Sequence, residues 1–584
     1  MGNIFGFIGK GNAKDIIISG LNQLSGKCES SGIVLKEEEK FTAVKTKGGA
    51  SELASKISKS EIPAAAGLAQ CCEDLRYKAS SVFAPPSFSD LFAVCSDGEI
   101  ENFDALVSQI QAPFPVASNE DLILALLSVN GNKKGSELLQ KVSELIRGDI
   151  NIAFISLKEE AIYCRGGLKK LIIGFSKYGC FVSSELSALT GFCEKYALLG
   201  ENEYARLSKD KISFFDSRQK KIKKTFMSVP AQRLILSEIP PEKELYNLPI
   251  AVKRTLANFV ENGEMKFDYL KFSNRYSERI NKIIVIGSNG SISTARCAVS
   301  LFETYFALTS VCKAPAEFLS SYSPIDKGTL VVAISKNGEE RKILQCCRKA
   351  KQHRAKILAL TNNPFSALSR ESDFPVFVPA ERKSLELSVF ECVSNYLALI
   401  LFSIYIGRKI QTVSPLYLGV SLKMAEMLPG ILSSIAGNNS NGESAALLIR
   451  ESENIFVCGG DSFSDETAKF LREKANKNAS AVSLDELTEY PQNLLENSAL
   501  LALFYDGENA RHFKSDLKKI KNSGAKIIII TSESAKEHFA EYENLITFAD
   551  TLPVFNPIPC LACAYKIALL ASTRENETRK EQSA

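Results

Sequence analysis

The feature that most constrains the fold is a repeated pattern of apolar strand, glycine turn and helix. It occurs first at residues 282–291, where Lys-Ile-Ile-Val-Ile-Gly precedes Ser-Asn-Gly-Ser, and it returns at residues 453–462. The equivalent residues Ile283 and Ile455 lie 172 positions apart. This spacing predicts two copies of one α/β unit, each long enough to form a domain.

Further apolar runs alternate with helical stretches after each glycine turn. We predict additional strands at residues 329–334, 356–361 and 374–378 in the first copy, and at 499–504, 526–531 and 545–548 in the second. Strands that alternate with helices form parallel, doubly wound sheets. Residues 1 to about 225 differ, because they contain many short β-like runs that are typical of a separate α+β domain.

Length and charge narrow the functional classes. The 584 residues suffice for three or four folding units, and 71 basic against 67 acidic residues leave a net charge of only +4. Because these charges are interspersed, we expect no nucleic-acid partner and no anionic membrane partner. The 15 cysteines are odd in number and include adjacent pairs, which favours reduced thiols and a cytoplasmic protein.

The start of the chain has no pattern typical of a secretory signal. The longest apolar run, residues 396–407, is about half the length that a bilayer span requires, so we expect a buried helix there.

Cys560 and Cys563 form a Cys-x-x-Cys pair, which can bind zinc or cycle as a dithiol. They continue into an apolar helical stripe without a second Cys or His pair nearby, so we expect small core residues, no metal and no cofactor.

A candidate ligand site follows the apolar run at residues 330–334. Ser335, Asn337 and Gly338 end this strand and precede a helix, an arrangement that presents hydroxyl and backbone N–H groups to a phosphate. The same residue types also cap helices and make turns, so a purely structural role is the alternative.

Several segments, taken in order, make this chain resemble the glucosamine-6-phosphate synthase family, the glutamine:fructose-6-phosphate aminotransferases. The segments are residues 6–9, 97–103, 181–189, 335–339, 363–373 and 471–473. The resemblance implies an N-terminal Ntn-hydrolase-like glutaminase domain at 1–225, a linker with helices at 226–275, and two sugar isomerase (SIS) domains at 276–415 and 416–584. It also implies a phosphorylated sugar, of the fructose 6-phosphate or glucosamine 6-phosphate class, as ligand and a dimeric assembly.

The glutaminase motifs of the family are altered in this chain. The family places a nucleophilic cysteine at the position of Gly2, and the resemblance aligns its glutamine clamp with residues 72–77, which read Cys-Glu-Asp-Leu-Arg-Tyr. Asp97 and Gly98 replace the Asn-Gly of the oxyanion site, and Glu185 replaces an Asp that holds the substrate amine. Because glycine has no nucleophile, we expect no glutamine hydrolysis.

The first SIS domain retains more of the family's pattern. By resemblance, Gly290, Ser291, Ser335, Gly338 and Ser388 fall on sugar-phosphate-binding positions. The chain departs from the family's pattern there at four positions: Lys336 for Gln, Asn337 for a phosphate-binding Ser, Glu340 for Thr and Phe390 for Lys. The Glu340 carboxylate would repel a phosphate dianion unless Lys336 neutralises it.

The second SIS domain carries the isomerase chemistry in the family. Glu473 falls on the glutamate that moves protons between sugar carbons, whereas Glu489 falls where the family keeps a ring-opening histidine. A glutamate with a raised pKa can do acid–base work, so Glu489 stays a candidate. The family's C-terminal lysine has only Lys580, within a charged tail, as its counterpart.

Three functions follow from this pattern. The first is a noncatalytic homologue that binds a phosphosugar and acts as a regulatory or structural subunit, as a homodimer or paired with an intact synthase. The second is an active glutamine- or ammonia-dependent aminotransferase or isomerase of amino-sugar synthesis that relies on Glu473 and Glu489. The third is a scaffold without a ligand.

Overall fold

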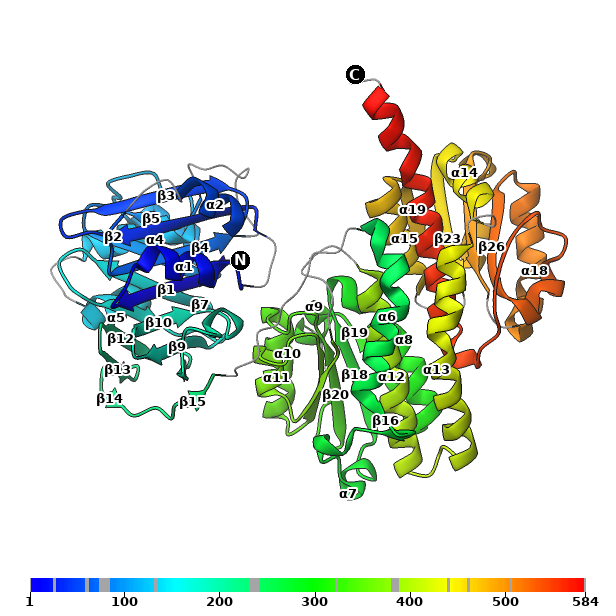
Figure 1. Ribbon diagram of the computed structural model, residues 1–584, viewed down its shortest axis with the longest axis horizontal. Coiled ribbons are helices and arrows are strands. Elements are labelled where there is room, and N and C mark those ends of the chain that lie inside the picture. Colours follow the sequence, from blue (N-terminus) through cyan, green and yellow to red (C-terminus); the bar gives the residue numbers. More distant parts are fainter. Residues whose placement is uncertain are drawn as a thin grey trace. The chain divides into compact units, whose positions relative to one another are not determined.

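The computed structural model describes residues 2–24, 28–57, 62–72, 84–130, 135–229, 241–320, 324–379, 388–438, 442–459, 463–504 and 507–581 (Figure 1). These residues divide into two compact units. One comprises Met1–Ile235 with Phe365–Ala367, and the other comprises Leu236–Pro364 with Leu368–Ala584. The division falls inside the stretch predicted as a linker, whereas the boundary at 415 between the two SIS domains stays a prediction.

The first unit contains two antiparallel sheets. The larger has the order β15-β11-β9-β10-β1-β4-β2-β3, and the smaller has the order β14-β13-β12-β8-β7-β6-β5. The strands of the larger sheet are β1 (Gly2–Gly9), β2 (Ser30–Lys36), β3 (Phe41–Lys47), β4 (Ala66–Cys72), β9 (Leu171–Ser176), β10 (Gly179–Ser183), β11 (Lys195–Leu199) and β15 (Met227–Ser228). Those of the smaller are β5 (Ser87–Phe88), β6 (Phe92–Gly98), β7 (Ile150–Ser156), β8 (Ile162–Arg165), β12 (Tyr204–Ser208), β13 (Lys211–Phe215) and β14 (Lys221–Ile222).

Alternation along the strands explains how these sheets stack. In β1, Phe5 and Phe7 point to one face, where they pack with helices α1 (Ala13–Leu21) and α2 (Ala50–Ile57). Ile4 and Ile8 point to the other face and join residues of the smaller sheet in a second apolar layer.

Helices α3 (Phe103–Gln109), α4 (Asn119–Val129) and α5 (Gly135–Leu145) cover the far face of the smaller sheet. The layers therefore run helices, sheet, sheet, helices, which confirms the expected Ntn-hydrolase-like fold.

The second unit contains two parallel five-stranded sheets with the same strand order. The first is β19-β18-β20-β21-β22 and the second is β24-β23-β25-β26-β27. Their strands are β18 (Lys282–Gly287), β19 (Ser310–Lys313), β20 (Thr329–Ile334), β21 (Lys356–Thr361), β22 (Phe374–Phe377), β23 (Asn454–Gly459), β24 (Asn478–Ala481), β25 (Ser498–Leu503), β26 (Lys526–Ser532) and β27 (Asn544–Phe548). The identical order confirms the repeat that the sequence predicted.

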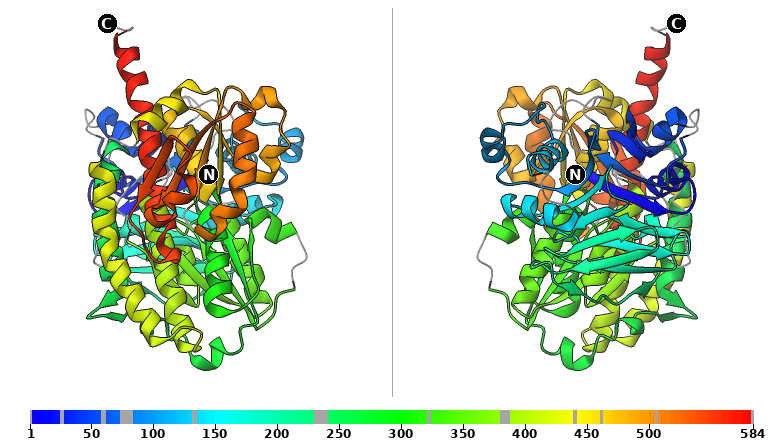
Figure 2. Two further views of the ribbon diagram at one scale, coloured as in Figure 1. Left: turned by 90° about the vertical axis from the view of Figure 1, so that its right-hand side faces the viewer. Right: turned by 90° about the vertical axis from the view of Figure 1, so that its left-hand side faces the viewer.

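Long helices join these sheets around one apolar core, which includes residues of β18, β23 and the helices between them. The helices of this unit are α6 (Pro241–Phe259), α7 (Asn274–Ser277), α8 (Ile292–Phe306), α9 (Pro315–Ser320), α10 (Arg341–Gln352), α11 (Ala367–Glu371), α12 (Val389–Lys409), α13 (Pro415–Gly437), α14 (Glu443–Glu451), α15 (Phe463–Ala475), α16 (Leu484–Thr488), α17 (Gln492–Leu495), α18 (Gly507–Asn522) and α19 (Pro557–Glu581). A short hairpin, β16 (Val260–Glu261) and β17 (Glu264–Met265), follows α6. The end of α19 projects beyond the other helices of the unit (Figure 2).

Three helical segments among the described residues are long and apolar enough to cross a membrane: α12, α13 and residues 553–572. In the most apolar window of α12 94% of the residues are buried inside the protein, and in residues 553–572 83% are buried. The apolar run at 396–407 lies inside α12, so its prediction as a buried helix is confirmed. Cys560 and Cys563 are buried in the core, also as predicted. Helix α13 differs, because only 39% of its window is buried.

Candidate functional site

The head of β1 is the first place where the sequence predicted a functional position. Gly2 opens this strand, and its register partner in the neighbouring strand is Cys72 of β4. Gly2 therefore contributes only backbone groups, and the thiol-bearing residue at this point of the sheet is Cys72. Sequence reasoning missed this pairing because the β1–β4 register is a long-range property. The remainder of the predicted clamp, residues 73–77, lies outside the described residues.

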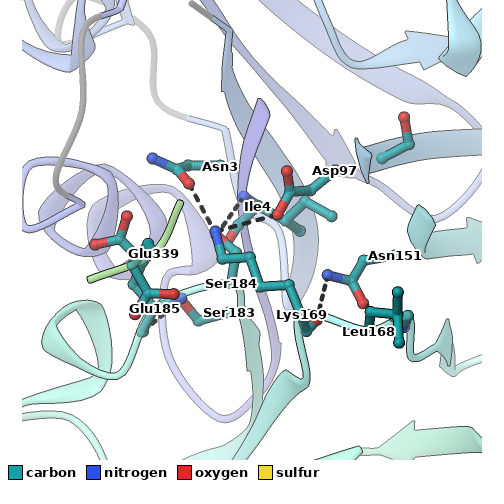
Figure 3. A network of polar contacts seen from close by, with 12 residues as sticks. Asn3, Ile4, Asp97, Asn151, Leu168, Lys169, Ser183, Ser184, Glu185 and Glu339 are labelled. Carbon is teal, nitrogen blue, oxygen red and sulfur yellow. Dashed lines mark hydrogen bonds and ion pairs between the residues drawn. The ribbon is translucent and has the colours of Figure 1, made fainter. Parts of the chain in front are cut away.

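A buried ion pair lies beside the head of β1. The Lys169 Nζ is 3.3 Å from the Asp97 Oδ2, and their side chains are only 7% and 3% exposed (Figure 3). The Asn151 amide donates a 2.7 Å hydrogen bond to the Lys169 carbonyl, which holds the lysine backbone in place. Asp97 was predicted as an altered oxyanion position, whereas Lys169 carries no sequence signal because it is 72 positions away. The predicted oxyanion position thus holds the Asp97 carboxylate, whose charge the Lys169 ammonium neutralises.

The end of β10 lies next to the head of β1 and the Asp97–Lys169 pair (Figure 3). The Ile4 N–H donates to the Ser184 Oγ at 3.0 Å, and the Glu185 N–H donates to the Ser183 Oγ at 3.1 Å. The Ser187 hydroxyl donates to a Glu185 carboxylate oxygen at 3.3 Å. Glu185, predicted as an amine-holding residue, therefore has a hydrogen bond from its own turn. Gly98 ends β6 directly after Asp97.

A second candidate site lies where β18 and β20 end side by side in the first parallel sheet. Strand order reverses at this point, which is where open α/β sheets bind ligands. Two glycines make the loops tight. A Cβ on Gly287 would lie 2.6 Å from the Ser291 carbonyl oxygen, and Gly338 has a φ of +66°, which favours glycine.

The carboxylate of Glu340 bridges these two loops. It accepts a 3.0 Å hydrogen bond from the Ser335 hydroxyl and another hydrogen bond from the Ser288 hydroxyl. The Ser335 oxygen in turn accepts the Gly338 N–H at 3.1 Å. Glu340 is also the residue that precedes α10, where a negative charge is favoured by the helix dipole. The Glu340 carboxylate thus accepts a hydrogen bond from Ser335, a predicted phosphate-binding residue, and one from Ser288, which the sequence did not single out.

The remaining predicted residues of this site surround the bridge. Asn337 accepts a 3.1 Å hydrogen bond from the Glu339 N–H, so its side chain closes its own turn. Gly290 and Ser291 form the short turn before α8. The Ser388 hydroxyl, at the start of α12, is buried and has no hydrogen-bond partner among the described residues.

Lys336 forms its ion pair with Glu391, a residue of α12 that the sequence did not single out. The Lys336 Nζ lies 2.6 Å from the Glu391 Oε2. Burial is the main cause that raises the pKa of Glu391, and the Lys336 ammonium opposes this shift. Lys336 was weighed as the cation that would neutralise Glu340. The structure places its ammonium against Glu391.

A second buried carboxylate, Glu466 of α15, lies close to this pair. It is fully buried, and the nearby groups are the Lys469 ammonium at 3.9 Å, the Ser293 hydroxyl and the carboxylates of Glu391 and Asp465. Burial raises the pKa of Glu466 to about 7. No sequence pattern marks this carboxylate, because its burial depends on how α15 packs against the first SIS domain.

The structure does not bring together the two acids predicted for isomerase chemistry. Glu473 lies exposed on α15, and Glu489 lies exposed at the end of α16. No hydrogen bond or ion pair joins them in the described part of the chain. Lys580 lies on α19, and its side chain is outside the described residues.

Comparisons with known proteins agree with this architecture. The SIS domain family matches residues 278–405. The chain is 23% identical to glutamine–fructose-6-phosphate aminotransferase (isomerizing) of Clostridium tetani over 590 residues, which is 97% of each chain. It is 22% identical to the protein of that name from Acinetobacter baylyi, over 99% of this chain and 98% of the relative.

A solved structure also matches the second unit's fold. It is the C-terminal domain of glucosamine-fructose-6-phosphate aminotransferase from Francisella tularensis, which is 20% identical, with a TM-score of 0.51. The match covers 57% of this chain and 96% of that structure. At this identity the likeness supports the fold of the SIS domains.

The Asp97–Lys169 pair predicts a large cost for removing one partner. Lys169→Met should lower the free energy of unfolding by about 3 kcal/mol, because Asp97 would stay buried without a counter-charge. The double variant Asp97→Asn, Lys169→Met should recover most of this loss. Denaturant unfolding of the full chain measures both effects. Lys141→Met, which removes an exposed ion pair with Glu144, is the matched control. Equal effects of Lys169→Met and Lys141→Met would contradict the buried pair.

The raised pKa of Glu466 predicts a pH dependence of stability. The folded state holds the proton up to about pH 7, whereas the unfolded carboxyl loses it near 4.5. Stability is therefore fully present below about pH 4.5 and is lost as the pH rises through about 7, by an amount on the order of 3 kcal/mol. Glu466→Gln should flatten this slope and raise the melting temperature at pH 8. Glu473→Gln, exposed on the same helix, is the control, and an unchanged slope in Glu466→Gln would refute the assignment.

Proposed function

Because the chain is a divergent member of the glutamine–fructose-6-phosphate aminotransferase family, we propose that it is a phosphosugar-binding homologue without glutaminase activity. Its isomerase activity would be weak or absent, and it would act in the cytoplasm as a regulatory or structural subunit of amino-sugar metabolism. The observation that carries this proposal is the buried Asp97–Lys169 pair beside Asn3 and Ile4 of β1 (Figure 3).

Glutamine hydrolysis needs a nucleophile and a site that stabilises negative charge on the amide oxygen. Gly2 provides no side-chain nucleophile. The Asp97 carboxylate stands where the resemblance places an oxyanion donor, and its charge would oppose that of the developing oxyanion. Lys169 compensates Asp97 but also holds it in place. These charges support a glutaminase domain that is retained for its fold.

The residues at the isomerase positions also support a weak or absent activity, for a different reason. Glu473 keeps the position of the proton-transferring glutamate, but Glu489 supplies a carboxylate where the resemblance places an imidazole. Both are exposed in the described chain. No hydrogen bond or ion pair between described residues joins the two carboxylates into one acid–base site. A dimeric arrangement, with itself or with an intact synthase, is part of the same proposal.

Phosphosugar binding at the first SIS domain rests on its hydroxyl groups. Ser288 and Ser335 already converge on one anion, the Glu340 carboxylate. The buried Ser388 hydroxyl has no partner among the described residues. A sugar phosphate would have to displace Glu340 from the two serines, because a dianion and a carboxylate repel each other at this distance. We therefore infer weak binding in the unmodified protein.

Turnover assays test the catalytic part of the proposal. With glutamine alone the protein should release no glutamate, and with fructose 6-phosphate and ammonia it should form little or no glucosamine 6-phosphate. Mass spectrometry of both products checks this. If glutamate does appear and Cys72→Ser abolishes it, Cys72 is a relocated nucleophile and the proposed loss of glutaminase is wrong. If glucosamine 6-phosphate forms from fructose 6-phosphate and ammonia, the proposed loss of isomerase activity is wrong.

Replacing Glu340 tests the binding part. Glu340→Thr should tighten binding of fructose 6-phosphate by about 10- to 100-fold, because the serine hydroxyls are released and the repulsion is removed. Isothermal titration calorimetry measures the affinities, and Glu443→Thr, at the start of α14, removes a comparable helix-start carboxylate as a control. Absence of binding to both the parent protein and Glu340→Thr would refute phosphosugar binding. Equal affinities would refute only the role of Glu340.

A further inference from the structure

The smaller sheet of the first unit ends in an edge strand, β14. Among the described strands its neighbour is β13, and it stands last in the order of the sheet (Figure 1). The Asp216 N–H donates to the Lys220 carbonyl at 3.0 Å, and Phe215 lies opposite Lys221. Because bonded and non-bonded pairs alternate along an antiparallel ladder, the backbone N–H and C=O of Lys221 point away from β13. An edge of this kind can pair with an added strand.

Basic side chains gather on one face of this edge. Arg206 of β12, Lys211 of β13 and Lys221 of β14 are all exposed. The register of the three strands puts them on the face that carries Phe215, where α5 packs mainly on β8 and β12. Lys223, two residues after Lys221, is exposed as well. We call these four residues the basic edge.

Acidic groups near the basic edge compensate little of its charge. Glu203 forms an ion pair with Lys224, which lies on the opposite face of the sheet. The Asp216 carboxylate accepts backbone N–H groups of its own turn at 2.9 Å. Asp210, in the turn before β13, is exposed and offsets one positive charge. The three lysines of the basic edge have no ion pair and no side-chain hydrogen bond with any described residue.

Lysines on an edge strand also protect a sheet from pairing with other chains, and this is the alternative role for β14. Protection needs a charge on the edge strand alone, whereas the basic edge extends over β12, β13 and β14. Like charges held together repel one another, and an anionic partner would relieve that repulsion. A peptide strand can use both the charges and the outward backbone groups of Lys221. Nucleic acid or an anionic lipid would use the charges only.

We propose that the basic edge binds an extended acidic peptide of a partner protein, which adds to β14 as an antiparallel strand. Every strand pair of this sheet is antiparallel, and strand addition gains its affinity from main-chain hydrogen bonds. Acidic residues at every second position would lie beside Lys221 and Lys223. The intervening positions would lie beside Ile222, which packs in the apolar layer between the two sheets, and would therefore be apolar.

This role is independent of phosphosugar binding, because it uses the N-terminal unit and neither parallel sheet. It gives that unit a function that needs no nucleophile. A regulatory or structural subunit has to contact another protein, and the basic edge states the chemistry of that contact.

Fluorescence anisotropy with the full chain and a labelled peptide, Thr-Glu-Val-Glu-Val-Glu-Thr, tests the proposal. We expect a dissociation constant of about 10–100 µM at low salt, weakened about tenfold at about 0.5 M salt because exposed charges are screened. Lys221→Glu and Lys223→Glu should each weaken binding about tenfold, with unchanged melting temperatures because both side chains are exposed. Lys177→Glu, at an exposed lysine between β9 and β10, is the matched control and should bind like the parent protein.

Two methylated peptides separate strand pairing from general charge attraction. The glutamates would lie opposite the outward backbone groups of Lys221, so N-methylation of their amides should abolish binding, whereas N-methylation of the valine amides should not. Equal binding of the two methylated peptides would overturn the added strand. So would the absence of peptide binding at about 1 mM protein.

Two further anions complete the test, a short single-stranded DNA and vesicles that contain phosphatidylserine. Either should bind more weakly than the peptide. Tighter binding of one of them, lost in Lys221→Glu and Lys223→Glu, would assign the basic edge to that anion and overturn the peptide.

Discussion

Burying a carboxylate is the constraint on which most of the unusual features of this protein depend. A charge in the interior is tolerated only when another charge or hydrogen-bond donors compensate it, or when it takes up a proton. Each solution is present. Lys169 compensates the buried Asp97, two serine hydroxyls donate to the half-buried Glu340, Lys336 contacts the half-buried Glu391, and the buried Glu466 holds its proton up to about pH 7. Two of these carboxylates, Asp97 and Glu340, lie at positions that the sequence analysis singled out, and each is held by groups of the protein itself.

The architecture was largely predictable because it follows from local patterns. The repeat at Ile283 and Ile455 predicted two parallel sheets, and the structure has two sheets with identical strand order. The many short β-like runs before residue 225 predicted a separate α+β domain, but not its layers, which follow from the alternation that the structure shows in β1. These patterns are read within a few residues of one another, so they survive at 22–23% identity to the relatives.

The candidate sites were less predictable, because each depends on a partner that is distant in sequence. Asp97 and Glu340 were recognised as unusual substitutions, yet their effects could not be foreseen from their own positions. Lys169 reaches Asp97 only through sheet packing, and the Ser288 contact to Glu340 needs β18 and β20 to be neighbours. Glu391 and Glu466 had no motif at all. The sequence shows where a charged side chain occurs, whereas the groups that neutralise it or donate hydrogen bonds to it are brought near only by the fold.

The contact of Glu340 with Ser288 and Ser335 has a consequence for motion. It joins the loops after β18 and β20 by hydrogen bonds within the chain, so the conformational entropy of ordering these loops is lost during folding. A ligand that binds Ser335 has to break this link before it can form its own contacts. The two loops would then be held by Glu340 in the empty state and by the ligand in the occupied state, so one set of hydrogen bonds is exchanged for another.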